Sequence, residues 1–454
     1  MEVLKKINGL VWGPPTLILI LILGICLSVS TGFAQIRLFP RAFSYFVQQF
    51  RKKGSSSFRS MCTALSATVG TGNLAGVAGA IALGGPGAIF WMWLCGILGM
   101  VIKYAEATLA VACKRKDENG QPIGGPMYMI RDHLPSGFHF LAWIYCFFGV
   151  VASFGVGNAT QINAVTDSLR QALESRGLLP GRGFYLLCGC LLAAATYFLL
   201  SGGRNRIGKA VEKLIPFAAG SYILLSLGVL ILRREAIPIA FAQIARGVFS
   251  PRAVTGGAVV SGLTALRIGV SRGVFTNEAG MGTAAMAHAC ARVSHPVNQG
   301  MMGIMEVFLD TLVICTLTAL VILVSGAEIP YGDDPGAALT ASAFTAVYGS
   351  WVGVVITLEL CLFAFATVLG WGLYGGLCAQ FLFGPQVWRL YPLVQGLMVI
   401  VGATMNTGTL WLLSEIVNGC MALPNLTVLF FLTPKVRQLT RSFIKMQREK
   451  PGSA

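Results

Sequence analysis

Long apolar stretches, separated by short polar segments, fill almost the whole chain. A helix needs about 20 predominantly apolar residues to cross a bilayer, and most of these stretches reach or approach that length. The pattern therefore predicts an all-α, polytopic membrane protein with about eleven transmembrane helices. The expected spans cover residues 16–33, 66–81, 88–113, 138–166, 184–201, 214–232, 255–290, 296–325, 341–383, 387–405 and 408–432.

One stretch, Ser66–Ile81, is apolar enough for a transmembrane helix but is unusually rich in glycine. Each glycine inside a helix costs about 1 kcal/mol relative to alanine, so the helix is expected to break near residues 69–73. In hydrocarbon, unpaired backbone groups are tolerated only where they line a cavity or are buried in protein. Such a break indicates a binding site, where carbonyls can hold a small cation and amides a carboxylate. The alternative is that the glycines only allow close helix packing.

A second glycine-rich stretch, Gly269–Thr283, is also expected to be broken. It follows the first by five spans, so its helix crosses the membrane in the opposite direction. Two interrupted spans in corresponding positions of two halves are typical of transporters built from inverted repeats, which bind their substrate near the middle of the membrane. Packing glycines alone would not predict this spacing.

Composition and charge agree with a membrane protein. The 454 residues are 55% hydrophobic and only 11% charged, with a mean hydropathy of +0.71, which excludes an ordinary water-soluble protein. The formal net charge of +16 could suggest a nucleic-acid partner. However, the basic residues fall in short loops between apolar spans, so we expect the lipid bilayer as a partner and no nucleic acid.

The basic residues also predict an orientation. The segments richest in Lys and Arg are the loops 34–60, 114–132 and 202–213 and the tail after residue 432. Alternate threading places them on one face, which the positive-inside rule makes cytoplasmic. The opposite loops, 167–183 and 233–254, also hold several arginines, so the asymmetry is incomplete. The first span lacks a clear signal-peptide cleavage site and is taken as retained. We expect a multi-pass inner (plasma) membrane protein with its N-terminus outside and its C-terminus in the cytoplasm.

The cysteines and histidines predict no metal site. The 12 cysteines are scattered through apolar segments without the spacing of metal ligands, and the 4 histidines do not cluster. We expect buried, reduced thiols and no cofactor other than a coupling ion. His288, near the end of an expected helix, is expected to pack or to cap rather than to bind a metal.

Four motifs resemble the alanine or glycine:cation symporter family. They are VGTGNLAGVA at 69–78, GGPGAIFWMW at 84–93, KYAEATLA at 103–110 and RGVFTNEAGMG at 272–282. The resemblance covers about residues 61–432. It implies a leucine-transporter-like fold of five plus five inverted helices with one additional N-terminal helix, and uptake of alanine or glycine driven by sodium. The implied division is an extra helix and basic loop (1–60), two repeats (61–235 and 236–432) and a basic cytoplasmic tail (433–454).

The resemblance also implies roles for residues at the first break. The GTGN sequence at 70–73 is similar to the unwound segment of leucine-transporter-like proteins. By position, the carbonyls of Ser66 and Val69 would face a sodium ion. The amides of Thr71 and Gly72 would receive the carboxylate of the substrate, and Asn73 would be a second cation ligand.

In this fold the eighth core helix, here expected over 341–383, completes the sodium site. A carbonyl is followed three and four residues later by small hydroxyl side chains. Phe363, Ala366 and Thr367 fall at this spacing. Thr367 supplies a hydroxyl, whereas Ala366 departs from the family pattern and supplies none, which weakens the assignment of the ion.

The family resemblance points to Gln161, Asn277 and Trp371 as walls of the substrate pocket. Each of the two amide side chains can both donate and accept hydrogen bonds, as a zwitterion requires, and Trp371 can close the apolar side. The alternative for Gln161 is a hydrogen bond between helices. The alternative for Trp371 is packing in the core or against lipid.

Acidic residues inside membrane spans are expensive and are functional candidates by default. Lys103, one turn before Glu106, is expected to pair with it. Asp310 is a candidate partner for a cation or a proton. Residues 61–81 contain no acid, so the substrate amine is expected to meet carbonyls of the second break and amide side chains. The full set of candidates is Glu106, Glu278, Glu306, Asp310, Glu359 and Glu415.

Three alternatives remain open at this point. A symporter of the same fold could use protons or another small substrate, and uptake that follows a pH gradient and ignores sodium would identify it. A membrane-embedded enzyme using the intramembrane acids with His288 would turn over a substrate, but neither a metal set nor a nucleophile and base pair is visible. A channel would not accumulate substrate against a gradient.

Overall fold

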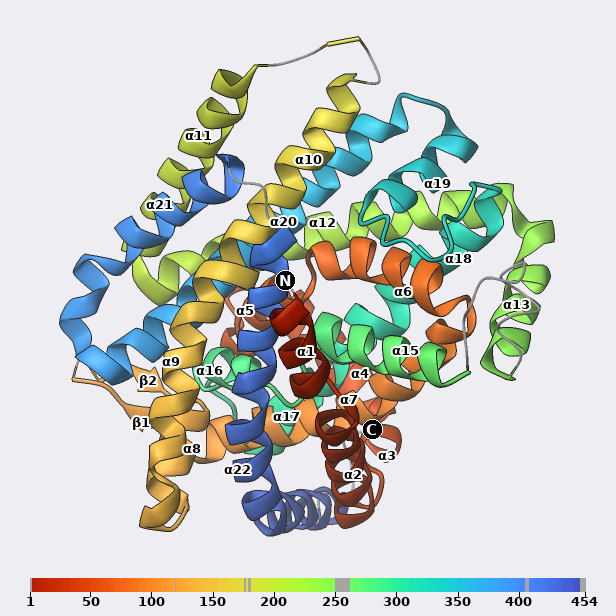
Figure 1. Cartoon of the computed structure of the whole chain (residues 1–454). Coiled ribbons are helices and arrows are strands. Elements are labelled where there is room, and N and C mark those ends of the chain that lie inside the picture. Colours follow the sequence, from red (N-terminus) through yellow and green to blue (C-terminus); the bar gives the residue numbers. More distant parts are fainter. Residues whose placement is uncertain are drawn as a thin grey trace.

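The computed structural model describes residues 2–118, 120–174, 177–178, 181–249, 262–404 and 408–449. Helices make up nearly all of this part of the chain (Figure 1). The strands β1 (Arg115–Lys116) and β2 (Pro122–Ile123) form a small antiparallel hairpin. The polytopic, all-α prediction is therefore confirmed.

The helices of the first half are α1 (Glu2–Val11), α2 (Pro14–Thr31), α3 (Ala34–Arg37), α4 (Phe39–Arg51), α5 (Ser56–Thr68), the π-helical η1 (Gly72–Gly76), α6 (Val77–Gly84), α7 (Gly87–Ala112), α8 (Pro126–His133), η2 (Ser136–Phe138), α9 (Phe140–Phe154), the π-helical η3 (Gly155–Ala159), α10 (Thr160–Glu174), α11 (Arg182–Ser201) and α12 (Gly203–Leu232).

The helices of the second half are η4 (Arg234–Ala236), α13 (Ile237–Phe249), α15 (Gly262–Asn277), α16 (Thr283–His288), α17 (Pro296–Val307), the π-helical η5 (Phe308–Cys315), α18 (Thr316–Ser325), α19 (Ala338–Tyr348), α20 (Val352–Phe383), η6 (Pro385–Arg389), α21 (Tyr391–Thr404) and α22 (Gly408–Arg448). The start of the expected span 255–290 and the end of 387–405 lie outside the described residues.

Several helices are long and apolar enough to cross a membrane. Within the described residues there are 7 such helices, or 8 if the bent pair formed by Ser56–Thr68 and Gly72–Gly84 counts as one span. Shorter apolar helices, among them Pro15–Thr31 and Tyr391–Thr404, accompany them. The exact number of about eleven spans stays a prediction.

Some expected boundaries were wrong. The span expected over 341–383 is two helices, because Gly349 interrupts it with φ 87° between α19 and α20. The expected loop 202–213 is the beginning of α12, and α22 continues well past residue 432. Lys and Arg are good helix formers. Basic residues therefore mark where a helix leaves the apolar layer, not where it ends.

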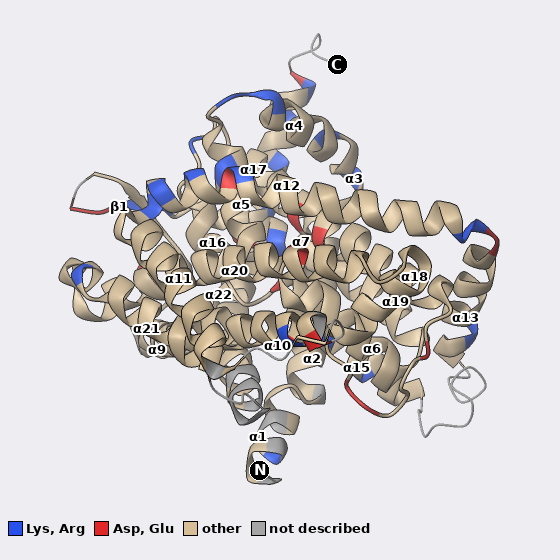
Figure 2. Ribbon diagram, turned by 90° about the horizontal axis from the view of Figure 1, so that it is seen from above, with Lys and Arg blue, Asp and Glu red and all other residues tan. Residues whose placement is uncertain are grey.

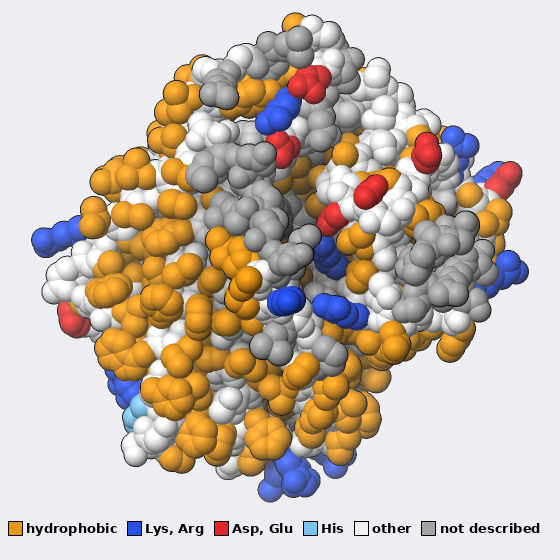
Figure 3. Space-filling model, viewed as in Figure 1, with side chains coloured by type: hydrophobic (Ala, Val, Ile, Leu, Met, Phe, Trp, Pro, Cys, Tyr) orange, Lys and Arg blue, Asp and Glu red, His pale blue; other side chains and the backbone are white. Residues whose placement is uncertain are grey.

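The surface is that of a protein surrounded by lipid. Hydrophobic side chains cover much of the face seen in Figure 3. Ile25, Phe147, Leu191 and Leu224 are each more than half exposed. Apolar surface on this scale is suited to hydrocarbon rather than water. Many of the Lys and Arg residues gather at the end of the molecule that carries the C-terminus, and the N-terminus lies at the opposite end (Figure 2).

Close backbone contact between helices depends on glycine at one crossing. A Cβ atom on Gly87, where α7 begins, would lie 2.2 Å from the backbone of Gly247 in α13. We expect Gly87→Val to force the helices apart and to lower stability by roughly 1–3 kcal/mol, as overpacking does. Thermal unfolding in detergent would measure this as a lower Tm. Gly220→Ala is the control, because nothing lies within 4 Å of that position. An unchanged Tm for Gly87→Val would contradict the crossing.

Candidate functional site

The chain is interrupted at the glycine-rich stretch between α5 and α6. The two flanking helical segments meet at an angle of 54°. Asn73 Oδ1 accepts a hydrogen bond of 3.0 Å from the Gly70 amide, and Thr340 Oγ1 donates one of 3.0 Å to the Leu74 carbonyl. Asn73 thus satisfies a backbone amide that the interruption leaves without a helical partner, and Thr340 adds a second hydrogen bond to a carbonyl that already accepts the Val77 N–H. Thr340 was not singled out from the sequence, and it carries no signal beyond being a small hydroxyl residue.

Gln161 binds the first break directly. Its Oε1 accepts hydrogen bonds from Thr71 Oγ1 at 3.0 Å and from the Thr71 amide at 3.4 Å. Its Nε2 donates to the Val156 carbonyl in η3. The amide expected to receive a carboxylate therefore faces the amide oxygen of Gln161. A carboxylate oxygen is a stronger acceptor for the same donors.

A polar chain joins the two breaks. Asn73 Nδ2 donates to Asp310 Oδ1 at 2.8 Å, and Thr311 Oγ1 donates to Asp310 Oδ2 at 2.9 Å. Asn277 Nδ2, at the end of α15, donates to Thr311 Oγ1 at 3.2 Å. Asp310 is fully buried, and no Lys or Arg of the described residues lies within 4 Å of its carboxylate. The chain thus connects both broken helices through a buried acid that lacks a paired protein cation.

The segments that carry the expected sodium ligands pack against each other where α5 passes α20. A Cβ on Gly70 would lie 2.5 Å from Thr367 Oγ1, and one on Gly370 would lie 2.6 Å from Ser66 Oγ. Thr367 Oγ1 donates its proton to the Phe363 carbonyl at 3.0 Å. Its lone pairs therefore remain available beside Gly70. Val69 and Ala366 are buried at the same crossing, and Ala366 brings only a methyl group.

Two cavities lie at the two ends of this region. One of about 480 Å³ is lined by Thr71 and Gly72 of the first break, together with Phe275. The ion pair between Arg272 and Asp334, 3.0 Å long, also lines it.

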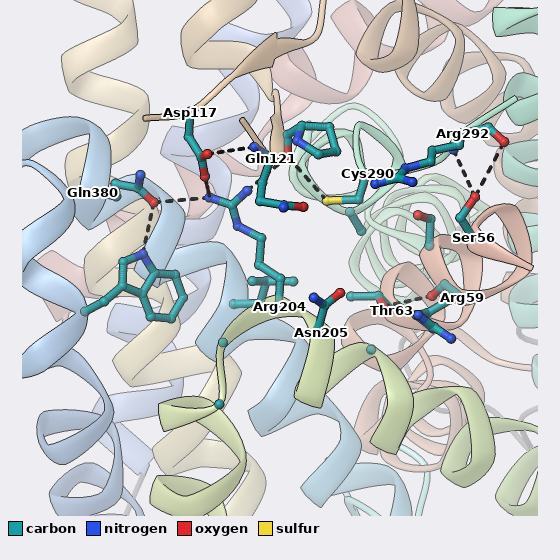
Figure 4. A pocket seen from close by; sticks show the side chains of 18 of the residues that line it. Ser56, Arg59, Thr63, Asp117, Gln121, Arg204, Asn205, Cys290, Arg292 and Gln380 are labelled. Carbon is teal, nitrogen blue, oxygen red and sulfur yellow. Dashed lines mark hydrogen bonds and ion pairs between the residues drawn. The ribbon is translucent and has the colours of Figure 1, made fainter. Parts of the chain in front are cut away.

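The second cavity, of about 720 Å³, is lined by Thr63 of α5 and Leu373 of α20 (Figure 4). Arg204 crosses it and contacts Asp117 at 3.3 Å and Gln380 at 3.3 Å. Thr63 and Thr71 lie on either side of Ser66 and Val69, the two expected sodium ligands of α5 and its end. The cavities therefore approach the buried α5 and α20 crossing from opposite ends.

Trp371 and Asn277 do not line these two cavities. The Trp371 ring is completely buried, and its Nε1 donates to Glu278 Oε1 at 3.0 Å. A Cβ on Gly157 would lie 2.1 Å from Trp371 Cβ, so the tryptophan packs directly against η3. η3 is followed by Gln161, so Trp371 lies between the second break and the helix that carries Gln161.

The second break follows α15 and turns through residues in the left-handed region. Glu278 has φ 52°, Gly280 has φ 92° and Gly282 has φ 76°. The amides of both glycines donate to Glu106 Oε1, at 3.1 and 3.0 Å. Left-handed backbone is uncommon for a residue other than glycine and tends to occur at functional sites. The sequence identified Glu278 only as an intramembrane acid.

The expected pair of Lys103 with Glu106 was wrong. Lys103 Nζ lies 3.2 Å from Glu306 Oε1 instead, while Glu106 accepts from backbone amides and from Asn425 at 2.7 Å. Spacing of one turn brought the pair near each other, but the tertiary fold supplied better donors for Glu106. His288 is packed as expected, since its Nε2 lies 2.8 Å from Glu306 Oε2. The side chain of Glu415 lies outside the described residues.

Comparisons with known proteins identify the family of the chain. Residues 1–453 match the sodium:alanine symporter family. The chain is 40% identical over 98% of its length to an uncharacterised transporter of Haemophilus influenzae, covering 96% of that protein. It is also 40% identical over its full length to the sodium/alanine symporter AgcS of Methanococcus maripaludis, covering 99% of it.

A solved structure supports the fold. The crystal structure of MhsT in complex with L-phenylalanine superimposes with a TM-score of 0.56 at 14% identity, covering 87% of this chain and 99% of that one. This likeness concerns the fold alone, which is that of leucine-transporter-like proteins. The chain is a multi-pass membrane transporter, not an enzyme, and it belongs to the sodium:alanine symporter family.

Proposed function

We propose that the protein couples the movement of sodium to the uptake of a small neutral amino acid, alanine or glycine. The observation that carries this proposal is the buried chain from Asn73 through Asp310 and Thr311 to Asn277, which connects two interrupted helices. Interrupted helices at membrane depth are where transporters of this architecture bind ions and substrates. The similarity to a protein named as a sodium/alanine symporter supports the choice of ion and substrate.

The substrate carboxylate is proposed to bind at Thr71 and Gly72. Both line the cavity of about 480 Å³, which exceeds the size of alanine or glycine. The carboxylate would take over the Thr71 donors that now face Gln161. The resemblance assigns the ammonium group to backbone carbonyls of the second break and to Asn277, and the apolar side to Trp371. Because neither side chain lines the cavity in this structure, these contacts require the two breaks to move when the substrate binds.

Sodium is proposed to bind oxygen atoms at the crossing of α5 and α20. The ligands would be the carbonyls of Ser66, Val69 and Phe363 and the hydroxyl of Thr367. Thr367 suits this role because its proton is already donated to Phe363. A hard cation prefers such oxygen ligands. Asn73 and Asp310 are a second candidate cation site, and the uncompensated Asp310 carboxylate supports it.

Alternating access would then connect the two cavities in turn. The ion pair of Arg272 with Asp334 lies at one cavity, and that of Arg59 with Glu212, 2.8 Å long, lies at the other. We propose the inner (plasma) membrane as the location, with the N-terminus outside and the C-terminus in the cytoplasm. The concentration of Lys and Arg at the C-terminal end supports this orientation (Figure 2).

Transport by proteoliposomes tests the proposal first. With an inward sodium gradient, the wild type should accumulate labelled alanine. Gly72→Leu should abolish uptake, because even a Cβ at that position lies 3.3 Å from Thr276. Gly76→Ala is the matched control at the same break, where a Cβ is 3.8 Å from Thr276. Accumulation that ignores sodium and follows a pH gradient would reject sodium as the driver.

Coupling between the ligands makes a second prediction. If sodium holds the break in the shape that receives the carboxylate, each ligand must tighten binding of the other by the same factor, typically about 5- to 150-fold. Isothermal titration of the purified protein with alanine, at low and saturating sodium, measures the effect of sodium on alanine affinity. Titration with sodium, with and without alanine, measures the effect of alanine on sodium affinity. Alanine affinity that does not change with sodium would contradict the mechanism.

Because Gly70 lies close to Thr367, we expect a substitution of Gly70 to weaken sodium binding selectively. Gly70→Ala places a methyl group 2.5 Å from Thr367 Oγ1 and should displace this ligand. The contact of the Thr367 hydroxyl with the ion is comparable to a hydrogen bond, which contributes about 1 kcal/mol. Its loss should therefore raise the apparent Kd for sodium roughly five- to tenfold or more. Sodium-dependent alanine uptake would measure it, with Gly76→Ala as the control. Equal sodium affinity in both variants would remove Thr367 from the site.

A further inference from the structure

Six ionisable or hydroxyl side chains meet at the second break, in the interior of the molecule. They are Lys103 and Glu106 of α7, Tyr145 of α9, Glu278 of the break, Glu306 of α17 and Tyr374 of α20. None is more than 3% exposed. Neither the expected sodium ligands nor the expected substrate ligands belong to this cluster, which we call the second-break cluster.

The charges of the second-break cluster do not balance. It contains three carboxyl groups and one ammonium group, and only Glu306 forms an ion pair with Lys103 among the described residues. An unbalanced charge buried at membrane depth is costly. If all three carboxyl groups were ionised, two negative charges would be left over.

His288 does not supply the missing positive charge. Its Nδ1 lies 2.7 Å from Gln299 Nε2. The Gln299 amide is oriented by Ser57, whose carbonyl accepts from Nε2 and whose hydroxyl donates to Oε1. Nδ1 therefore accepts a hydrogen bond, and the ring hydrogen sits on Nε2, facing Glu306. This pattern is that of a neutral imidazole.

Apart from Lys103 Nζ and Glu306 Oε1, which face each other in the ion pair, three polar atoms of the second-break cluster lack hydrogen-bond partners among the described residues. They are Glu106 Oε2, Tyr145 OH and Tyr374 OH, all inaccessible to solvent. Both tyrosines interact electrostatically with Glu106 and Glu278. Buried polar atoms without partners are rare and call for an explanation.

The partners of each carboxyl group single out Glu106. Glu306 faces Lys103 with one oxygen and the His288 N–H with the other. Glu278 receives Trp371 Nε1 on one oxygen and Thr283 Oγ1 on the other. Glu106 receives all three of its donors on Oε1, and only its Oε2 faces no donor.

We propose that Glu106 is a proton-binding site, with the proton on Oε2 and the hydroxyls of Tyr145 and Tyr374, which are not hydrogen-bonded to Oε2 in this structure, turning to accept it. A proton fits this place because it needs only the one carboxylate oxygen that receives no hydrogen bond. Binding is the association of H⁺ with the carboxylate and needs no further reactant.

Occupation of this site would act on the second break. Glu106 Oε1 holds the amides of Gly280 and Gly282, and hydrogen bonds to a charged carboxylate are stronger than those to a neutral acid. A proton on Glu106 therefore loosens the turn that follows Asn277. The connection to transport rests on the symport proposed above, whereas proton binding does not.

Infrared difference spectroscopy of the purified, full-length protein tests proton binding without any transport. A pH change should produce a carboxylic-acid C=O band from a buried group in the wild type. Glu106→Gln should remove this band, since glutamine keeps one oxygen for the three donors but cannot titrate. Glu359→Gln, at a buried acid of α20 outside the cluster, is the matched control and should keep it. A spectrum of Glu106→Gln identical to the wild type overturns the proposal.

Tyrosine variants provide a second arm if Glu106→Gln does not fold. Tyr145→Phe and Tyr374→Phe each remove only an unpartnered hydroxyl. If each hydroxyl turns to accept the bound proton, as proposed, its removal should lower the pH midpoint of the band by about half a unit or more. Unchanged midpoints in both variants overturn the proposal. A band that responds to sodium at constant pH and not to pH would identify sodium as the ligand and also overturn it.

Alanine binding measured by calorimetry in buffers of different ionisation enthalpy connects the site to transport. In the wild type the heat should depend on the buffer, because protons are exchanged, and in Glu106→Gln it should not. If the wild type shows no sodium-driven uptake, the proposed function is refuted, but the infrared result on proton binding still stands. The two proposals can therefore be refuted independently.

Discussion

The structure depends on one constraint, which is that backbone groups removed from a helix inside a membrane must find partners in the protein. Both interruptions meet this demand partly with side chains from distant segments. Thr340 bonds the Leu74 carbonyl at the first break and Glu106 bonds the amides of Gly280 and Gly282 at the second, whereas Asn73 bonds Gly70 from within the first break. Because Thr340 and Glu106 come from other helices, each break is fixed only when the whole bundle is assembled. A change in any of these helices therefore alters the hydrogen bonds at a break.

Two separate connections join the breaks to each other. One is polar and runs from Asn73 through Asp310 to Thr311 and Asn277. The other is a packing contact, in which Trp371 is held by Glu278 and presses against Gly157 near the Gln161 that binds Thr71. A substrate that displaces Gln161 and a cation that engages Asp310 would thus act on the same pair of broken helices. Such shared elements are what ligand coupling requires.

Buried charge adds a second constraint. Within the described part of the chain, Lys103 is the single Lys or Arg among the acids at the second break; it pairs with Glu306, and Glu106 binds the amides of the break instead. The arrangement places the strongest backbone contacts of the break under the control of one carboxyl group. A protein needs no such acid for packing alone, since apolar residues would fill the same space at lower cost.

The sequence by itself determined the membrane-spanning helical class, the positions of both interruptions and the family, because apolar run length, glycine content and long motifs are local properties. It also placed Thr71, Gly72 and Gln161 at one break through resemblance. Only the tertiary structure decided which acid pairs with Lys103, that Thr340 serves Leu74, and that Glu278 holds Trp371. It also divided the expected span 341–383 at Gly349. These choices depend on which helices lie side by side, and partners more than 60 residues apart leave no periodic trace in the chain.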